Sequence, residues 1–351
     1  MLNPAPRARV LHPALSLPDA SSPGGRCVNL LSMPQTLPTF DDILAAAARI
    51  APHAHATPVL HSRELDRLAG CALFFKAEPL QRSGAFKFRG ACNAVWSLPE
   101  TEAARGVVTH SSGNHGGALA LAARTRGIPC HVVVPEGAVA AKLASIERYG
   151  ATIHRCAPTQ AAREAACARV QAETGAHLIH PFTHPAVIAG QGTAILELHN
   201  SHGAFDAVVT PVGGGGLSTG TAIATARMAP ACRIYAAEPA GADDTARSLA
   251  AGRRLPDFTP DTICDGLRTA IGEPNFAALR QYGVQVLVAD DEDTIRAMRL
   301  LWQCLKLLVE PSSALVLAAL LKHRERFAGQ RVGLVLSGGN VDLDALPWGP
   351  A

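Results

Sequence analysis

The feature that most constrains the fold is an alternation of short apolar segments with helix-like segments, in which several apolar segments end in turns of small residues. The apolar run 206–212 leads directly into four glycines at 213–216, and the apolar runs 106–110 and 332–336 end in similar turns. Strands that alternate with helices form mostly parallel sheets flanked by helices. The pattern therefore predicts an α/β fold, whose ligands bind where the strands end.

The composition predicts a large core and excludes several classes of partner. Of the 351 residues, 48% are apolar and 17% are charged, so the chain can bury a substantial core. The net charge of +3 is too small to favour nucleic acid or an anionic membrane surface. Nine scattered cysteines without a C-x-x-C pair predict reduced thiols in a cytoplasmic protein. The longest apolar run, 314–321, is too short to span a membrane.

The first part of the chain differs from the rest. Five prolines within the first 32 residues interrupt any periodic pattern, so we expect residues 1–36 to be a disordered extension, with Met33 as an alternative start. From residue 39 the pattern is regular. It predicts helices near 41–50, 87–96, 116–126, 140–149, 161–174 and 187–200, and strands near 73–76, 106–110, 130–134, 152–154, 177–180, 206–212 and 332–336.

One lysine has an unusual chemical setting. Lys87 lies between Phe86 and Phe88 at the start of a predicted helix. Aromatic neighbours remove water from the amine, and desolvation disfavours its charged form. A neutral amine can attack an aldehyde, which makes Lys87 a candidate Schiff-base lysine for pyridoxal phosphate. The alternative is a surface lysine whose stem covers an amphipathic helix.

The four glycines form a candidate phosphate site. Gly213, Gly214, Gly215 and Gly216 follow a buried strand and open a helix, so their backbone N–H groups can converge on an anion. The segment matches neither G-x-G-x-x-G nor G-K-[ST], which argues against dinucleotide and P-loop sites. It contains a G-x-S-x-G match centred on Ser218, so a serine hydrolase is an alternative. A glycine turn without a ligand is another.

Two further turns carry polar groups at strand ends. The turn with Ser111, Ser112, Asn114 and His115 combines backbone amides and hydroxyls at the start of a helix, which suits a carboxylate. A helix cap alone would need one such residue. The last turn places the Ser337 hydroxyl among glycines, where it can face a ring nitrogen, and a simple turn is the alternative.

Glu238 and Asp244 form a candidate cation site. They are six residues apart in a segment expected to be irregular, after a strand, with the Ala242 carbonyl between them. Carboxylate and carbonyl oxygens are ligands for Mg²⁺, Mn²⁺ or Ca²⁺. Two solvated acids in a loop are the alternative.

Together these motifs resemble the fold-type II pyridoxal-phosphate enzymes, and within them the serine racemase and serine/threonine dehydratase group. The resemblance extends from about residue 40 to residue 343 and is carried by ordered motifs at 76–87, 109–116, 187–193, 213–216, 306–311 and 336–342. It implies a two-domain fold like that of the tryptophan synthase β-subunit, with mostly parallel sheets flanked by helices. It also implies a large cofactor-binding domain at 37–105 and 186–345, a small domain at 106–185, and a homodimer.

The resemblance further implies a role for each matching residue. The cofactor would be bound covalently by Lys87, beside Phe86, with Asn114 on its ring hydroxyl, Ser337 on its ring nitrogen and the four glycines on its phosphate. The substrate carboxylate would be held by Ser111, Ser112, Asn114 and His115. Glu238, the Ala242 carbonyl and Asp244 match the divalent-cation site of the serine-racemase-like branch. Phe182 departs from the animal racemases, which carry a polar residue there.

The chemistry expected of these residues is α,β-elimination. Lys87 would remove the α-proton of a small amino acid, and the cofactor would delocalise the resulting charge. The leading hypothesis is a dehydratase that converts L-serine or L-threonine to pyruvate or 2-oxobutyrate and ammonia. A serine racemase that uses Ser112 as its second proton-transfer group and a threo-3-hydroxyaspartate dehydratase are alternatives, as is a non-catalytic nucleotide-binding module.

Overall fold

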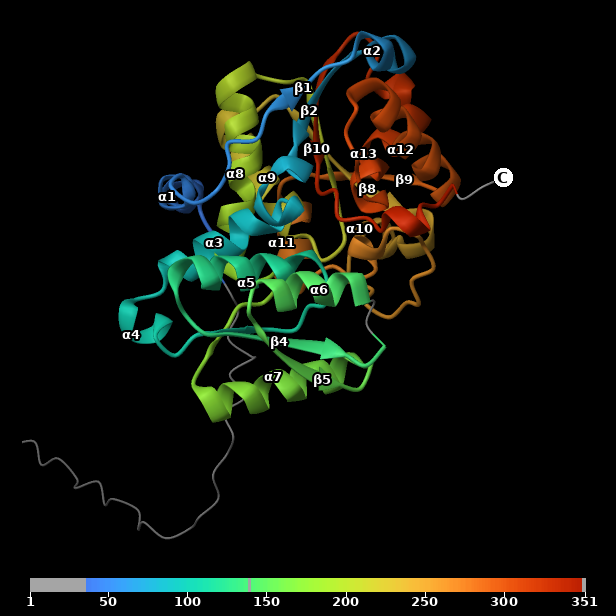
Figure 1. The fold of residues 1–351 in the computed structure, drawn as a ribbon. Helices are drawn as coiled ribbons and strands as arrows, with labels where there is room; N and C mark the ends of the chain where they lie inside the picture. Colours follow the sequence, from blue (N-terminus) through green and yellow to red (C-terminus); the bar gives the residue numbers. More distant parts are fainter. Residues whose placement is uncertain (1–35, 138–139, 349–351) are drawn as a thin grey trace, which may run out of the picture. The chain divides into compact units, whose positions relative to one another are not determined.

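The predicted α/β architecture is confirmed in a computed structural model that describes residues 36–137 and 140–348 (Figure 1). A six-stranded sheet has the order β1-β2-β10-β7-β8-β9, and β1 is the one described strand that runs antiparallel to its neighbour. Its strands are β1 (Val59–Leu60), β2 (Ala72–Ala77), β7 (Ala207–Pro211), β8 (Arg233–Pro239), β9 (Gln285–Ala289) and β10 (Arg331–Leu336).

A second sheet has four parallel strands in the order β5-β4-β3-β6. They are β3 (Val107–Thr109), β4 (Cys130–Pro135), β5 (Thr152–Cys156) and β6 (His177–Leu178). The strands of the six-stranded sheet come from both sides of this stretch of sequence. The domain boundaries drawn from the sequence stay a prediction, and residues 1–35 of the expected N-terminal extension lie outside the described residues.

Helices cover both faces of each sheet, as parallel strands require. On the six-stranded sheet, one face packs against α12 and α13 and the other against α8 and α9. On the four-stranded sheet, α5 and α6 cover one face and α7 the other. The helices are α1 (Phe40–Ile50), α2 (Arg63–Ala69), α3 (Lys87–Ser97), α4 (Glu100–Ala103), α5 (Asn114–Arg126), α6 (Ala140–Arg148), α7 (Gln160–Thr174), α8 (Pro185–His202), α9 (Gly216–Met228), α10 (Asp244–Ala251), α11 (Glu273–Gln281), α12 (Asp291–Leu305) and α13 (Pro311–Lys322).

Local chemistry explains where several elements begin and end. The Thr39 hydroxyl accepts a hydrogen bond from the Asp42 N–H, and the Asp42 carboxylate accepts one from the Thr39 N–H, so a capping box starts α1. Gly127 ends α5 with a left-handed φ of 75°, which glycine adopts without strain. The segments predicted from the sequence agree with the observed elements within two residues at each end.

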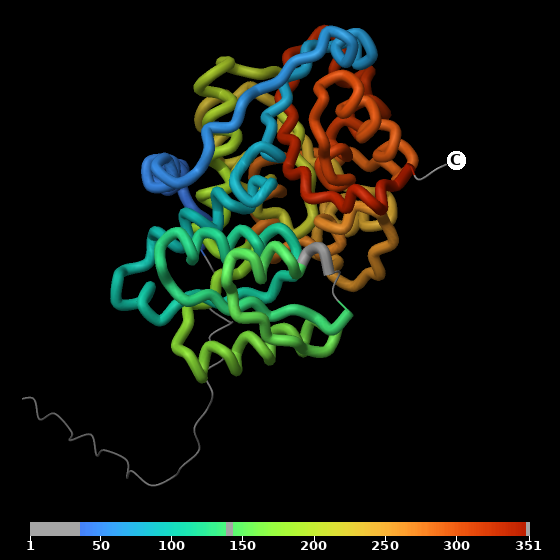
Figure 2. The backbone as a smooth tube through the Cα atoms, in the orientation of Figure 1, coloured from blue at the N-terminus to red at the C-terminus, as the bar shows by residue number. Residues whose placement is uncertain are grey.

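The strand order places a late segment of the chain beside an early one. Strand β10, near the C-terminus, lies between β2 and β7, so Figure 2 shows a red segment of the tube beside a blue one. Because these three strands are parallel, the segments that follow β2, β7 and β10 all begin at the carboxyl-terminal end of the sheet. No helix in the described part of the chain has the length and apolarity needed to cross a membrane.

Candidate active site

Lys87 is the first residue of α3 and lies just beyond the edge where β2 ends. Its amine donates a hydrogen bond to the Pro181 carbonyl at 3.1 Å and lies over the Phe86 ring, 5.2 Å from the ring centroid. Burial lowers the pKa of Lys87 to about 8, against the opposing effect of the Glu310 carboxylate. Near physiological pH, a useful fraction of this amine is therefore neutral and nucleophilic.

Ser337 is held beside Lys87 by backbone pairing. The Phe86 N–H donates to the Ser337 carbonyl at 2.9 Å, and the Gly339 N–H donates to the Gly84 carbonyl at 2.9 Å. Ser337 itself is only 2% exposed. Two sequence motifs separated by about 250 residues thus meet at one place, and the buried hydroxyl suits a ring nitrogen that approaches from the Lys87 side.

The four glycines form a turn into which side chains would not fit. A Cβ at Gly214 would lie 2.3 Å from the Phe182 ring, and a Cβ at Gly215, where φ is 91°, would lie 2.7 Å from the Asn275 side chain. Asn275 fixes the turn from outside, because its amide donates to the carbonyls of Gly214 and Phe182.

The same turn offers free donors. Within residues 36–137 and 140–348, no protein group accepts a hydrogen bond from the backbone N–H groups of Gly213, Gly214, Gly215 or Gly216. The turn also opens α9, whose dipole favours an anion at this end. A cradle of unsatisfied amides at a helix N-terminus fits the phosphate of the predicted cofactor.

The turn after β3 supplies the polar groups at the start of α5. Ser111, Ser112 and Asn114 are half-buried, and Gly113 caps the helix without a side-chain bond. The Asn114 amide nitrogen donates to both carboxylate oxygens of Glu310, at 2.9 and 3.0 Å. Sequence reasoning did not assign Glu310, although it lies in one of the quoted motifs, because its partner is 196 residues away.

His115 is buried next to Lys87 and is uncharged. Burial, and then the charge of Lys87, hold the pKa of His115 well below its ordinary value. Its Nε2 lies 3.4 Å from the Ile179 carbonyl, which can only accept, so the proton is on Nε2 and Nδ1 is an acceptor. The predicted carboxylate contact of His115 is therefore available from its backbone N–H and not from its ring.

A second histidine near Lys87 was not assigned from the sequence. His180 precedes the carbonyl that Lys87 contacts, and its ring packs against His110 and Phe182, with centroid distances of 5.1 and 4.6 Å. Burial, and the neighbouring His110 and Lys87, lower the pKa of His180 to about 3. Its Nδ1 accepts from the Thr183 N–H, so the ring is neutral and cannot supply a counter-charge to a substrate carboxylate.

The predicted cation ligands are buried, and one local expectation about them is wrong. Glu238 lies within β8 and Asp244 begins α10, so this segment is not irregular, and both side chains are fully buried rather than solvated. Glu238 accepts from the N–H groups of Thr245 and Ala246, whereas Asp244 accepts from the Ile271 N–H through one oxygen only.

Burial raises the pKa of Glu238 to about 8 and that of Asp244 to about 6. The second oxygen of Asp244 is buried without a partner in the described chain. In the same residues there is no group of three or more His, Cys, Asp and Glu side chains that could hold a metal. A cation here would therefore need the two carboxylates together with main-chain oxygen, and the orphaned Asp244 oxygen fits that requirement.

The serine hydrolase alternative is wrong. Ser218 is fully buried, and its hydroxyl donates to the Pro211 carbonyl at 3.1 Å and accepts from Thr210 at 3.0 Å. His323, the histidine that such an enzyme would need downstream, ends α13, and its Nε2 contacts the Val288 carbonyl in β9. A nucleophile must be exposed at the tip of its turn and hydrogen-bonded to a base, and Ser218 meets neither condition.

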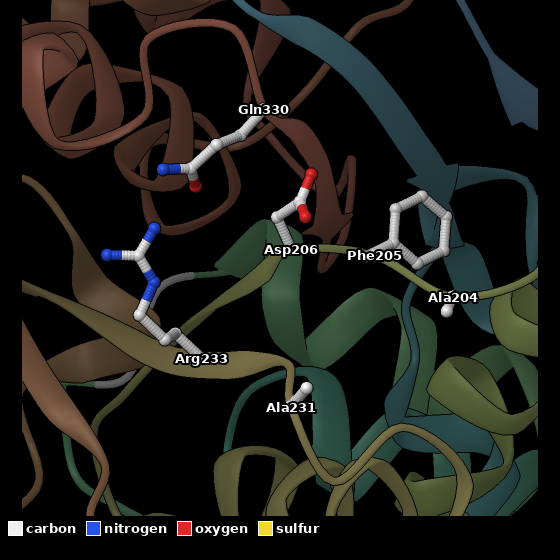
Figure 3. Close-up of a pocket in the computed structure, with 6 residues that line it drawn as sticks. All are labelled: Ala204, Phe205, Asp206, Ala231, Arg233 and Gln330. Carbon is white, nitrogen blue, oxygen red and sulfur yellow. The ribbon is translucent and has the colours of Figure 1, made fainter.

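A pocket of about 350 Å³ lies at the opposite edge of the six-stranded sheet (Figure 3). Asp206, Arg233 and Gln330, whose side chains surround it, stand immediately before or at the start of β7, β8 and β10, whereas the glycine turn and Ser337 follow the ends of β7 and β10. Because ligands of parallel sheets bind at the carboxyl ends, this pocket is separate from the Lys87 site.

Comparison with known proteins agrees with this arrangement. The family model of pyridoxal-phosphate dependent enzymes matches residues 50–338. The β-hydroxyaspartate dehydratase of Paracoccus denitrificans is 48% identical over 312 residues, which cover 89% of this chain and 99% of that protein. The serine racemase of Dictyostelium discoideum is 46% identical over 317 residues, with 89% and 98% covered. The solved structure of maize serine racemase superposes with a TM-score of 0.86 at 44% identity, covering 88% of this chain and 95% of that one.

Proposed function

The chain belongs to the pyridoxal-phosphate dependent enzymes, and from this premise we propose that it is a dehydratase of small β-hydroxy-α-amino acids. The observation that carries the proposal is the Lys87 amine, whose pKa burial lowers to about 8. Like the glycine turn and Ser337, it follows the carboxyl end of one of three neighbouring parallel strands, β2, β7 and β10. A base with a pKa near the working pH is suited to removing an α-proton.

The residues present fit the cofactor part by part. Lys87 would bind its aldehyde carbon, the amides of Gly213, Gly214, Gly215 and Gly216 its phosphate, Phe86 and Asn114 its ring and ring hydroxyl, and Ser337 its ring nitrogen. When bound, pyridoxal phosphate supplies an electron sink for the negative charge that develops on the α-carbon of the substrate. A serine hydroxyl at the ring nitrogen carries no charge, which favours a neutral ring and hence the rapid loss of a β-substituent.

Protein groups would carry out the two remaining tasks, removal of the α-proton and binding of the substrate carboxylate. Lys87 accepts the α-proton when its amine is released by the incoming amino group. The N–H groups at the start of α5, with the hydroxyls of Ser111 and Ser112, would bind the substrate carboxylate, because the helix dipole favours an anion there. The neutral rings of His115 and His180 leave this contact to backbone and hydroxyl donors.

L-Serine and L-threonine are the first substrates to test. Elimination releases the β-hydroxyl as water, and hydrolysis takes up one water and releases ammonia, so that the net products are pyruvate or 2-oxobutyrate and ammonia. 3-Hydroxyaspartate has the same reacting groups, and the 48% identity to a β-hydroxyaspartate dehydratase supports it as a further substrate. Racemisation of serine, with Ser112 as the second proton-transfer group, is supported by the similarity to serine racemases.

We also propose a divalent cation bound by Glu238, the Ala242 carbonyl and Asp244. Two buried carboxylates of raised pKa would both be ionised beside a cation, and the unpartnered Asp244 oxygen would gain a ligand. The site reaches the cofactor cradle through two backbone donors: Ile271 donates to Asp244, and the next residue, Gly272, donates to the Gly214 carbonyl.

One incubation tests the proposed reaction. The purified holoenzyme is given L-serine, D-serine, L-threonine or threo-3-hydroxyaspartate, and keto acid, ammonia and both serine enantiomers are measured together. Equimolar keto acid and ammonia from at least one substrate supports a dehydratase, with Lys87→Ala as the inactive control. Enantiomer exchange without keto acid would replace the proposal by racemisation, and neither product from any of the four would refute both.

A further inference from the structure

A chain of hydrogen bonds joins four segments around Lys87. Glu310 accepts from the Asn114 amide nitrogen through both carboxylate oxygens, at 2.9 and 3.0 Å. The Asn114 amide oxygen accepts from the side chain of Asn340 at 2.9 Å. Asn340 also donates to the carbonyl of Ser83 at 2.8 Å, three residues before Phe86. The first turn of α5 is thereby tied to the segments that precede α3 and follow β10.

Glu310 is held in place independently of Asn114. It caps the start of α13, and its N–H donates to the Gly338 carbonyl at 3.0 Å. A Cβ at Gly338 would lie 2.7 Å from the Glu310 carboxylate, so this glycine allows the carboxylate to pack against the backbone next to Ser337. Glu310 is 4% exposed, and a carboxylate so buried costs free energy unless charges or donors compensate it.

One charge that interacts with Glu310 is that of Lys87. Three titratable groups in the described chain interact with the Lys87 amine: His115 from α5, His180 from the loop before α8, and Glu310. Both histidines are neutral because burial lowers their pKa, so Glu310 is the one anion of the three. Glu310 also acts electrostatically on the buried thiol of Cys264, whose pKa burial raises to about 12 and which is therefore uncharged.

We propose that Glu310 is a positioning residue for cofactor capture: its carboxylate orients the Asn114 amide toward the bound ring and stands as the counter-charge to the Lys87 amine. Asn340 contributes to the same orientation: its side-chain amide donates to one end of the Asn114 amide, and that end must therefore be the oxygen. This inference rests on pyridoxal phosphate being the cofactor of the proposed function, and it concerns how this chain captures and holds that group.

The two contacts of Glu310 make separable contributions. Its charge stabilises the protonated form of Lys87, so a neutral replacement must release the amine at lower pH. Its hydrogen bonds to Asn114 hold one amide donor and leave the other for the ring hydroxyl of the cofactor. Asn340 shares the second contribution and not the first, since it carries no charge. Charge and orientation can therefore be measured in different variants.

The test measures capture of pyridoxal phosphate by apo-protein from pH 6 to 10, followed by stopped-flow absorbance, together with the equilibrium dissociation constant. Glu310→Gln should lower the pH midpoint of the capture rate by about one unit and weaken binding. Glu310→Asp, which keeps the charge, should retain the wild-type midpoint. Asn340→Ala should leave the midpoint unchanged and weaken binding about fivefold, as expected for the loss of one hydrogen bond.

Several outcomes would overturn the inference. One is an unchanged midpoint in a Glu310→Gln protein whose circular dichroism matches the wild type, and another is an equal shift in Glu310→Gln and Asn340→Ala. Ionisation of the free cofactor is common to all variants and cancels in the comparison. No amino-acid substrate is present, so a chain that captures the cofactor as described but turns over no hydroxy amino acid refutes only the proposed reaction.

Discussion

Two lysines eleven residues apart, one fully buried and one half-buried, serve opposite purposes. Lys76, in β2, is 1% exposed, and its amine contacts the Glu197 carboxylate at 2.5 Å and the Thr57 carbonyl at 2.7 Å. Lys87 has no carboxylate within ion-pair distance in the described chain, and its hydrogen bond goes to a neutral carbonyl. Desolvation lowers the pKa of both amines.

The two amines differ most in their partners, and Lys87 is also the less deeply buried side chain. Glu197 also binds Arg89, which is fully buried and pairs with Glu78, so the charge of Lys76 belongs to a network of two cations and two anions. Such a network holds its protons and fixes β2, α3 and α8 against one another. Lys87, two residues before Arg89 on the same helix, has a neutral hydrogen-bond partner and, among the described residues, no carboxylate within ion-pair distance, so it can release its proton.

The largest expected effect comes from exchanging these lysines for neutral residues. Lys87→Ala should lower turnover of the best hydroxy amino acid by at least about 10³-fold, because it removes both the covalent attachment and the base. Lys76→Met should act mainly on stability. Borohydride reduction of the holoenzyme followed by peptide mass spectrometry should place the cofactor on Lys87. A label on Lys76, or full turnover by Lys87→Ala, would contradict the assignment of the reactive amine to Lys87 and of the structural one to Lys76.

The next effect tests the network of Lys76. Glu197→Gln leaves Lys76 and Arg89 short of one anion, and breaking a buried pair on one side should lower the free energy of unfolding by about 3 kcal/mol. Denaturant unfolding of the apo-protein measures it.

The matched control is Glu64→Gln, which makes the same chemical change in the exposed pair with Arg67 and should leave stability unchanged. Equal stability of the two variants would mean that the network contributes no more than a surface ion pair.

The comparison also shows what the sequence could and could not predict. Lys87 was identified because its aromatic neighbours are adjacent in sequence, and the glycine turn because strand, glycines and helix are consecutive. Glu310 was not assigned a role, because its meaning depends on Asn114 and Lys87, which the fold brings to it from more than 190 residues away. Periodicity gives the elements, but the partner of a buried charge is decided by strand order.

The surroundings of Glu238 and Asp244 were also not predictable from the local sequence. Glu238 and Asp244 were expected in an irregular segment, because nothing in the local sequence shows that β8 continues through Glu238 between β7 and β9. The burial of Glu238 follows from that position inside the sheet, and Asp244 is buried at the start of α10, after β8. The sequence could predict that oxygen ligands are present, and only the structure shows that one of those oxygens lacks a partner.

A smaller effect concerns the proton-transfer group expected opposite Lys87. Ser112 is half-buried at the start of α5, and racemisation needs a second group on the other face of the substrate. Ser112→Ala should therefore reduce exchange between L- and D-serine about tenfold more than it reduces keto acid formation. Chiral chromatography and a keto acid assay on the same sample measure the ratio, with Ser111→Ala as the control. Parallel losses in both assays would make Ser112 a carboxylate ligand alone.

The smallest expected effect is that of metal chelation, and it concerns the buried acids instead of the lysines. Glu78 and Glu197 are compensated by Arg89, whereas no side-chain cation pairs with Glu238 or Asp244 in the described chain. A bound divalent cation would compensate the negative charge of Glu238 and Asp244, as Arg89 compensates that of Glu78 and Glu197. Removing a ligand that binds only the folded state lowers stability by mass action, so thorough chelation should lower the melting temperature by about 2–5 °C.

Added Mg²⁺, Mn²⁺ or Ca²⁺ should restore the melting temperature of the chelated wild type, and it should have no effect on Asp244→Asn, which lacks one ligand charge. Because Ile271 and Gly272 link Asp244 to the Gly214 carbonyl, chelation should also weaken cofactor binding slightly, whereas Glu64→Gln should respond to chelation as the wild type does. If chelation left both melting temperature and cofactor affinity unchanged, the pair would need no cation: Glu238, whose pKa is raised to about 8, would be neutral near pH 7, and Asp244, whose pKa is raised to about 6, would carry the single charge.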